Sequence, residues 1–274
     1  MGWIGVRRLG VATVAVASLA SAGTAVASAH PVLVRPAPMI ATAPLSPFGL
    51  GNDVVTSSNW SGYAVEAASV FTDVRGSWVE PAATCNTFGA HYAAFWAGID
   101  GYSSESVEQL GTDSDCNGYD RPSYYAWYEM YPAAPVTLSS AAYPVEQGDT
   151  LSAEVSVNGA EYTLSLKSSR GWTFQITKLG IGLDQSSAEL IAEAPSTCIL
   201  SCHALPLANF GTVPFSNVEA AVGGGSDAAF DSFTTDAGPH DIVAQSLLGT
   251  VKAQPSSLTP SAAGDSFSVT WHHS

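Results

Sequence analysis

The most constraining feature of this sequence is a succession of short segments in which apolar and polar residues alternate between turn residues. Valine, threonine and aromatic residues dominate these segments, which is typical of strands. Asn158-Gly159 separates two of them and predicts a hairpin. No long stretch has the 3.6-residue apolar period of a helix. The expected strands include residues 63–66, 70–79, 92–99, 124–131, 150–157, 162–166 and 172–177.

This pattern predicts an all-β chain. Many short strands within one domain form either a sandwich or a barrel. Hydrophobic residues make up 46% of the 274 residues, which is enough to build a sizeable core. No fixed-period repeat divides the sequence. We therefore expect a single β domain over residues 59–274.

The N-terminus is typical of an exported protein. Arg7 and Arg8 precede an apolar run, and small residues end it at Ala27-Ser28-Ala29. This predicts a signal peptide over residues 1–29, and hence a secreted protein. A membrane anchor is the alternative, but the run is shorter than the roughly 20 residues that span a bilayer. Residues 30–58 are rich in proline and alanine and are expected to form a linker or pro-segment.

The charge balance excludes one class of partner. Nine Lys and Arg residues face 24 Asp and Glu residues, for a net charge of −15. Such a chain is not expected to bind nucleic acid through its phosphates. The balance fits acid tolerance, because few positive charges remain to repel one another at low pH. It also fits an ordinary acidic secreted protein. We expect a monomer without a membrane partner.

Four cysteines follow the predicted signal peptide, and an even number in an exported chain predicts two disulfides. Proximity favours Cys85–Cys116 and Cys198–Cys202. Residues 113–118 open like a calcium loop, but Tyr124 stands where the bidentate glutamate belongs. A polar turn is therefore the preferred interpretation. No metal site and no cofactor are expected.

Polar residues that could do chemistry are placed on the expected strands rather than in loops. Gln109 lies in residues 107–113, Glu129 in residues 125–132, and Glu189 and Glu193 in residues 187–195. Because residues two apart share a strand face, Glu189 and Glu193 point the same way. With neighbouring aromatic residues they could line a groove for an extended polymer. An ordinary solvated sheet face is the alternative.

Several segments, in the same order, resemble the glutamic peptidases, or eqolisins. They are Ser58-Asn59-Trp60-Ser61-Gly62, residues 96–101 (WAGIDG), Gln109-Leu110-Gly111, residues 126–132 (AWYEMYP) and residues 188–193 (AELIAE). The similarity runs from about Ser58 to Phe215. It implies an antiparallel β-sandwich of two packed sheets, of the concanavalin-like or jelly-roll type. One disulfide of fungal members has no cysteines here.

The resemblance implies a secreted, acid-acting endopeptidase that cuts proteins and peptides with an activated water. Gln109 and Glu193 would be the catalytic pair, with Glu193 as general base and Gln109 stabilising the oxyanion. Glu189 is the competitor for the base, since spacing alone does not separate the two. The expected substrate-binding or positioning residues are Trp60, Trp96, Asp100, Trp127, Glu129 and Tyr131. The alternative function is a glycan-active sandwich, either a glycoside hydrolase or a lectin-like module.

Overall fold

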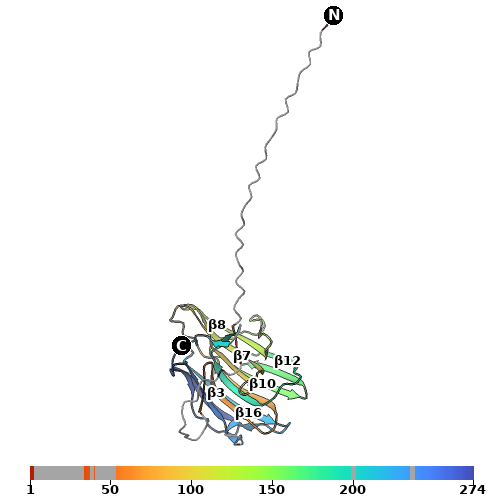
Figure 1. The fold of residues 1–274 in the computed structure, drawn as a ribbon, viewed down its shortest axis with the longest axis vertical. Helices are drawn as coiled ribbons and strands as arrows, with labels where there is room; N and C mark the ends of the chain where they lie inside the picture. Colours follow the sequence, from red (N-terminus) through yellow and green to blue (C-terminus); the bar gives the residue numbers. More distant parts are fainter. Residues whose placement is uncertain (3–33, 38–39, 41–53, 199–201, 235–237) are drawn as a thin grey trace. The chain divides into compact units, whose positions relative to one another are not determined.

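The computed structural model describes residues 1–2, 34–37, 40, 54–198, 202–234 and 238–274 (Figure 1). Most of the predicted signal peptide and much of the predicted linker lie outside these residues. The described part of the chain is almost entirely strand, and its one helical element is the single turn η1 (Phe230–Ser232). The predicted all-β fold is confirmed.

The strands form two antiparallel layers. The first layer has the order β12–β11–β10–β4–β16–β20. Its members are β12 (Thr173–Leu179), β11 (Glu161–Ser168), β10 (Thr150–Asn158), β4 (Phe71–Val79), β16 (Thr212–Val222) and β20 (Asp265–Trp271). The short strand β17 (Ala228–Ala229) pairs with β16.

The second layer has the order β18–β3–β13–β6–β7–β8–β9 and carries every catalytic candidate. Its members are β18 (His240–Gln245), β3 (Trp60–Glu66), β13 (Ser187–Glu193), β6 (Ala94–Ile99), β7 (Val107–Asn117), β8 (Pro122–Tyr131) and β9 (Val136–Thr137). The strand β19 (Val251–Pro255) pairs with both β18 and β20 and so joins the layers. The short strand β5 (Ala90–His91) pairs with β7.

The two layers pack face to face around one large core. Strands β4 and β10 of the first layer contact β6 of the second without pairing with it. The side chains between them alternate with outward-facing neighbours, as the pleat requires. Fully buried members include Phe71, Phe95, Ile99, Leu110 and Leu190. The predicted sandwich is confirmed.

The predicted hairpin is also confirmed. Asn158 on β10 is the partner of Glu161 on β11, and Gly159 adopts a φ of 64° between them. A positive φ at this turn position favours glycine, because a side chain there would be strained.

Two cysteine predictions have different outcomes. Cys85 and Cys116 form the predicted disulfide. Cys202 is disulfide-bonded as well. It lies on β15 (Cys202–Ala204), where its backbone partner is Cys198 of β14 (Ser196–Cys198). The Cys198 side chain lies outside the described residues, so the pair Cys198–Cys202 stays a prediction.

The polar turn expected at residues 113–118 is wrong over most of its length. Asp113, Asp115 and Asn117 continue strand β7, and the turn begins at Gly118. The strand persists because each of its residues from Asp113 to Cys116 has a partner on β8. Strand β2 (Val54–Ser57) also extends the sheet, since it pairs in parallel with β18 before residue 58 is reached.

Candidate functional site

A second cluster of apolar side chains covers the face of the second layer that points away from the core. It contains Trp60 of β3, Trp96 of β6, Trp127 of β8 and Ile191 of β13. These residues alternate with core residues along their strands, as the sequence pattern predicted. The candidate polar residues lie among them on this same face.

The strand register places Gln109 and Glu193 at different levels. Gln109 is the partner of Gly98 on β6, and Gly98 in turn is the partner of Glu189 on β13. Glu193 is the partner of Ala94, whose other partner is Asp113. Glu193 therefore lies four residues along the strand direction from the level of Gln109.

Gly98 makes room for the groups around it. A Cβ atom at this position would lie 2.9 Å from the ring of Trp96 and 3.1 Å from Cβ of Gln109. The missing side chain lets the indole of Trp96 lie over β6. Any larger residue would push Trp96 or Gln109 out of place.

Three nitrogen donors hold the carboxylate of Glu193. Trp96 Nε1 donates to Oε2 over 2.9 Å, and Asn59 Nδ2 donates to Oε1 over 3.2 Å. The third donor is the backbone N–H of Ala37, 2.9 Å from Oε1. The side chain of Glu193 is fully buried. A carboxylate with this many donors has a fixed position and a partly compensated charge.

Burial is the main influence on the ionisation of Glu193. It raises the pKa of this carboxyl well above its ordinary value, and the negative charge of Glu129 adds to the rise. The hydrogen bonds from Ala37, Trp96 and Asn59 oppose it. The protonation state of Glu193 therefore depends on whether water reaches the site.

Gln109 is oriented by the neighbouring strand. Its Nε2 donates to Oε2 of Glu129 over 2.9 Å, and both side chains are fully buried. Because a carboxylate oxygen only accepts, the contact fixes which end of the amide faces Glu129. Oε1 of Gln109 accepts no hydrogen bond from the described residues. Glu129 thus links the pair, since it binds Gln109 and also acts electrostatically on Glu193.

Glu189 has very different surroundings. Within the described residues neither of its carboxyl oxygens is held by a nitrogen donor. Burial raises the pKa of Glu189 well above its ordinary value, and the Ser187 hydroxyl opposes this rise. The charges of Asp100, Glu108 and Glu66 raise the pKa further. A buried carboxyl without strong donors is expected to stay protonated. This contrast favours Glu193 over Glu189 as the base.

Asp113 belongs to the site, although we did not predict it. Trp127 Nε1 donates to its Oδ1 over 2.6 Å, and the Tyr125 hydroxyl donates to its Oδ2 over 2.7 Å. Burial and the charge of Asp115 raise the pKa of Asp113 well above its usual range. Its spacing from Gln109, four residues along one strand face, was the available indication.

Asn59 is the second residue that the sequence interpretation missed. Besides its bond to Glu193, it accepts a hydrogen bond from the Ser57 hydroxyl over 2.8 Å. The resemblance places Asn59 in a matching segment but gives it no role of its own. Its position next to Trp60, at the start of β3, was the available indication of a role near the groove.

Two expected substrate-binding residues make other contacts. Asp100, at a φ of 72°, accepts hydrogen bonds from the backbone N–H groups of Gln185 and Ser186. It thereby holds the loop that leads into β13. The Tyr131 hydroxyl lies 3.9 Å from Sγ of Cys202, so the end of β8 contacts the β14–β15 hairpin.

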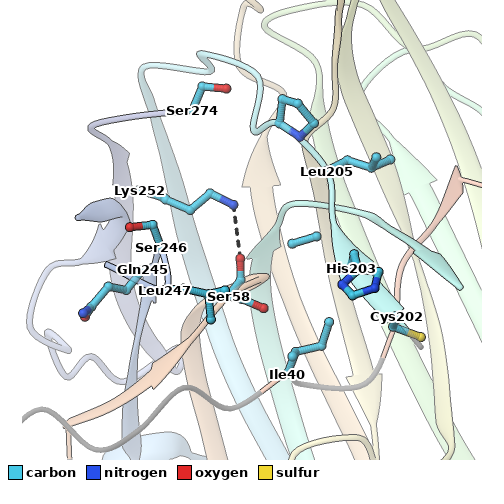
Figure 2. Close-up of a pocket in the computed structure, with 12 residues that line it drawn as sticks. Ile40, Ser58, Cys202, His203, Leu205, Gln245, Ser246, Leu247, Lys252 and Ser274 are labelled. Atoms are coloured by element: carbon cyan, nitrogen blue, oxygen red, sulfur yellow. Dashed lines mark hydrogen bonds between the residues drawn. The ribbon is translucent and has the colours of Figure 1, made fainter. Parts of the chain in front are cut away.

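Two cavities lie beside the residues around Glu193, and we call these residues together with the two cavities the groove. A small one of about 30 Å³ is lined by Asp113, Tyr125 and Trp127 together with Pro36. A larger one of about 460 Å³ is lined by Ile40, Ser58, Leu205 and Lys252, among others. Figure 2 shows Lys252 reaching Ser58, to whose carbonyl oxygen its Nζ donates over 3.1 Å.

No three His, Cys, Asp or Glu side chains are grouped to hold a metal ion in the described ranges. No helix in the described residues has the length and apolarity to cross a bilayer.

Comparisons with known proteins agree on one family. The model of the Peptidase A4 family matches residues 58–259. Aspergillopepsin-2 from Aspergillus niger is 28% identical over 240 residues, which cover 78% of each chain.

Solved structures of two peptidases have the same fold. Scytalido-glutamic peptidase, determined with a peptide-based transition state analogue, superposes with a TM-score of 0.64 at 21% identity, covering 78% of this chain and 98% of its own. Aspergilloglutamic peptidase from Aspergillus niger superposes with a TM-score of 0.53 at 27% identity, covering 66% and 99%.

Proposed function

Since the chain belongs to the Peptidase A4 family, it is a glutamic-type endopeptidase, and we propose that Glu193 and Gln109 are its catalytic pair in acid solution. The family membership does not support the glycan-active alternative. The pair would act on an extended peptide lying along the aromatic face of the second layer.

The chemistry needs a base and an oxyanion donor. A water attacks the carbonyl carbon of the scissile bond while Glu193 accepts its proton. The carbonyl oxygen becomes an oxyanion, and a side-chain N–H of Gln109 donates to it. When the C–N bond breaks, the proton on Glu193 passes to the leaving amine. The amide of Gln109 does not titrate, so it donates equally well at low pH.

The observation that carries the proposal is the difference between the two glutamates of β13. Trp96 and Asn59 donate to Glu193 from nitrogen, whereas the donor that lowers the pKa of Glu189 is the Ser187 hydroxyl. Only the first arrangement favours an ionised carboxylate, which a general base must be. The Gln109–Glu129 contact supports the second half of the pair, because it presets the amide.

Acid action requires Glu193 to be charged at the working pH. In the closed groove burial raises the pKa of Glu193, so water must reach the carboxylate before it can act in acid. The donors Trp96 and Asn59 remain after opening and hold that pKa down. The pH optimum is thus set by how far the groove opens.

Export completes the proposal. The predicted signal peptide (1–29) and the acidic composition support a secreted enzyme that works outside the cell. We assign residues 59–274 to the peptidase domain, with β2 as a short addition before it.

The test compares the wild type with Gln109→Ala on a denatured protein at pH about 3–4 and at neutral pH. Loss of one oxyanion donor is expected to reduce kcat by roughly a hundredfold or more. Cleavage by the wild type in acid, with this loss in the variant, supports the pair. Equal rates for the two proteins would contradict the role of Gln109. Absence of cleavage at both pH values, even by a chain that has been cut within residues 41–53, would contradict the activity.

A further inference from the structure

The groove around Glu193 holds a part of the chain itself. Strand β1 (Val34–Arg35) pairs in antiparallel fashion with β14, where Val34 is the partner of Thr197 and Arg35 of Ser196. On its other side β14 pairs with β15. The segment therefore joins the small sheet as an added edge strand, which is a common way to bind an extended peptide.

The next two residues enter the site. Pro36 is buried and lines the small cavity beside Asp113 and Trp127. Ala37 is fully buried, and its N–H donates to Oε1 of Glu193. Its carbonyl oxygen accepts from Trp60 Nε1 over 2.9 Å and from Asn59 Nδ2 over 3.3 Å. Site residues thus bind both backbone polar groups of Ala37.

Ile40 makes further contacts with the start of β3 and the residue before it. The N–H of Ile40 donates to Oδ1 of Asn59 over 2.8 Å, and the carbonyl of Ile40 accepts from the backbone N–H of Ser58 over 2.9 Å. Ile40 also lines the larger cavity, where Figure 2 shows it near Ser58. The described residues of the segment thus line the small cavity at Pro36, bind Glu193 at Ala37 and line the large cavity at Ile40.

We propose that residues 34–37 and Ile40 are a built-in ligand of the groove and that the chain is latent while they occupy it. The proposal rests on the proposed function, because latency requires Glu193 to be the base. A water that donates to Oε1 must displace the N–H of Ala37. A substrate must also compete for Asn59, Trp60 and the edge of β14.

The contacts explain why the segment blocks the site without being a good substrate. Cleavage needs a carbonyl carbon near Glu193 and its oxygen on Gln109. In this structure Glu193 instead accepts a hydrogen bond from the N–H of Ala37. The carbonyl oxygen of Ala37 accepts from Trp60 and Asn59 rather than from Gln109.

The sequence prepares the segment for this role. Ala37 stands between Pro36 and Pro38. Proline restricts its own φ and biases the residue before it towards extended conformations. A chain that is already extended loses less conformational entropy on binding. The small side chain of Ala37 also suits a fully buried position.

The first test uses the intact chain with Ala37→Pro and, as a control, Ala82→Pro at an exposed position outside the strands. At position 37 proline removes the N–H and places a ring carbon against Oε1 of Glu193. Cleavage of an internally quenched peptide should rise by roughly tenfold or more in Ala37→Pro, as for the loss of a hydrogen bond to a charged group. Ala82→Pro should stay near the wild type. Equal activity of all three intact chains would overturn the proposal.

The second test releases the segment after folding. A recognition sequence for a site-specific protease is inserted within residues 41–53, and the folded chain is assayed before and after cutting. Cutting should activate it, and a synthetic peptide of residues 34–40 should inhibit the cut chain again. The same peptide with an N-methyl group on Ala37 should not. Inhibition by both peptides alike would overturn the assigned contact.

Hydrogen exchange separates this proposal from the proposed function, because it needs no activity. The Ala37 amide should be protected in the intact chain and in its Glu189→Gln variant. If it is protected but intact and cut chains are both inactive, the proposed function fails and occupation of the groove stands. If it exchanges freely in an intact chain that cleaves peptide, occupation fails and the function stands.

Discussion

The side-chain amide of Gln109 donates from Nε2 to Oε2 of Glu129 over 2.9 Å, and the two residues are direct partners on β7 and β8. The contact fixes the amide before any substrate arrives. Preorganised donors of this kind are worth more than mobile ones, because no reorganisation is needed during the reaction.

Replacing Glu129 with glutamine should therefore lower kcat while leaving KM nearly unchanged. Glutamine can present its NH₂ group to Gln109, so the amide of Gln109 loses its preferred orientation. We expect a fall in kcat of roughly ten- to a hundredfold. Steady-state kinetics of the chain cut within residues 41–53 measure this fall in kcat, and Glu161→Gln at an exposed position is the control. A change confined to KM would contradict the orienting role.

Replacing Trp96 with phenylalanine should move the acid limb of the pH–rate profile to higher pH. The indole N–H lowers the pKa of Glu193, and phenylalanine removes that donor while keeping an aromatic ring. A base with a raised pKa stays protonated to a higher pH. We expect a shift of about one pH unit in kcat/KM. An unchanged acid limb would mean that Glu193 is not the titrating base.

The fold should be more stable in mild acid than at neutral pH. Burial raises the pKa of Glu80 to about 7, against the hydrogen bonds from Ser114, Thr112 and Trp78. Between the ordinary pKa of 4.5 and about 7, the folded state binds a proton that the unfolded state has lost. The free energy of unfolding should thus decrease as pH rises through this window.

Glu80→Gln tests that sign. Glutamine resembles the protonated acid, and its amide can donate to the Ser114 hydroxyl. That hydroxyl is then free to donate to the Pro81 carbonyl oxygen, which lies 2.8 Å away. Urea unfolding at pH 4.5 and 7 should show a smaller pH-dependent loss in the variant, by on the order of 2 kcal/mol. An equal loss in both proteins would exclude Glu80 as the source.

Much of the fold was predictable from local patterns. Alternation located the strands and assigned Gln109, Glu189 and Glu193 to their faces, since each face follows from a period of two. The Cys85–Cys116 disulfide followed from proximity. Strand register was not predictable, because it depends on pairing between distant segments.

The rest of the site depended on contacts that a pattern does not contain. Asp113 resembled part of a turn until its partners on β8 extended the strand. Asp100 lay in a segment typical of the groove, yet it binds the loop before β13. The residues around Ala37 had the composition of a linker, because their polar partners, Asn59, Trp60 and Glu193, are supplied by other strands.

Gly111 should not tolerate even a methyl group. A Cβ atom there would lie 2.1 Å from the carbonyl oxygen of Phe95 and 2.7 Å from Cβ of Trp96. Gly111→Ala should lower the free energy of unfolding by roughly 2 kcal/mol or more and reduce activity by displacing Trp96. Gly225→Ala is the control, since its nearest neighbour would be the Val222 carbonyl at 3.1 Å. Urea unfolding that shows equal stability for the two variants would contradict this packing.

The central claim is that Glu193, and not Glu189, activates the water. The most direct measurement is kcat/KM of the cut chain at pH about 4 for Glu193→Gln and Glu189→Gln, on one quenched peptide. Loss of the base should lower kcat/KM by roughly a thousandfold in Glu193→Gln, while Glu189→Gln stays within about tenfold of the wild type. The reverse order, or near-wild-type activity in Glu193→Gln, would contradict it.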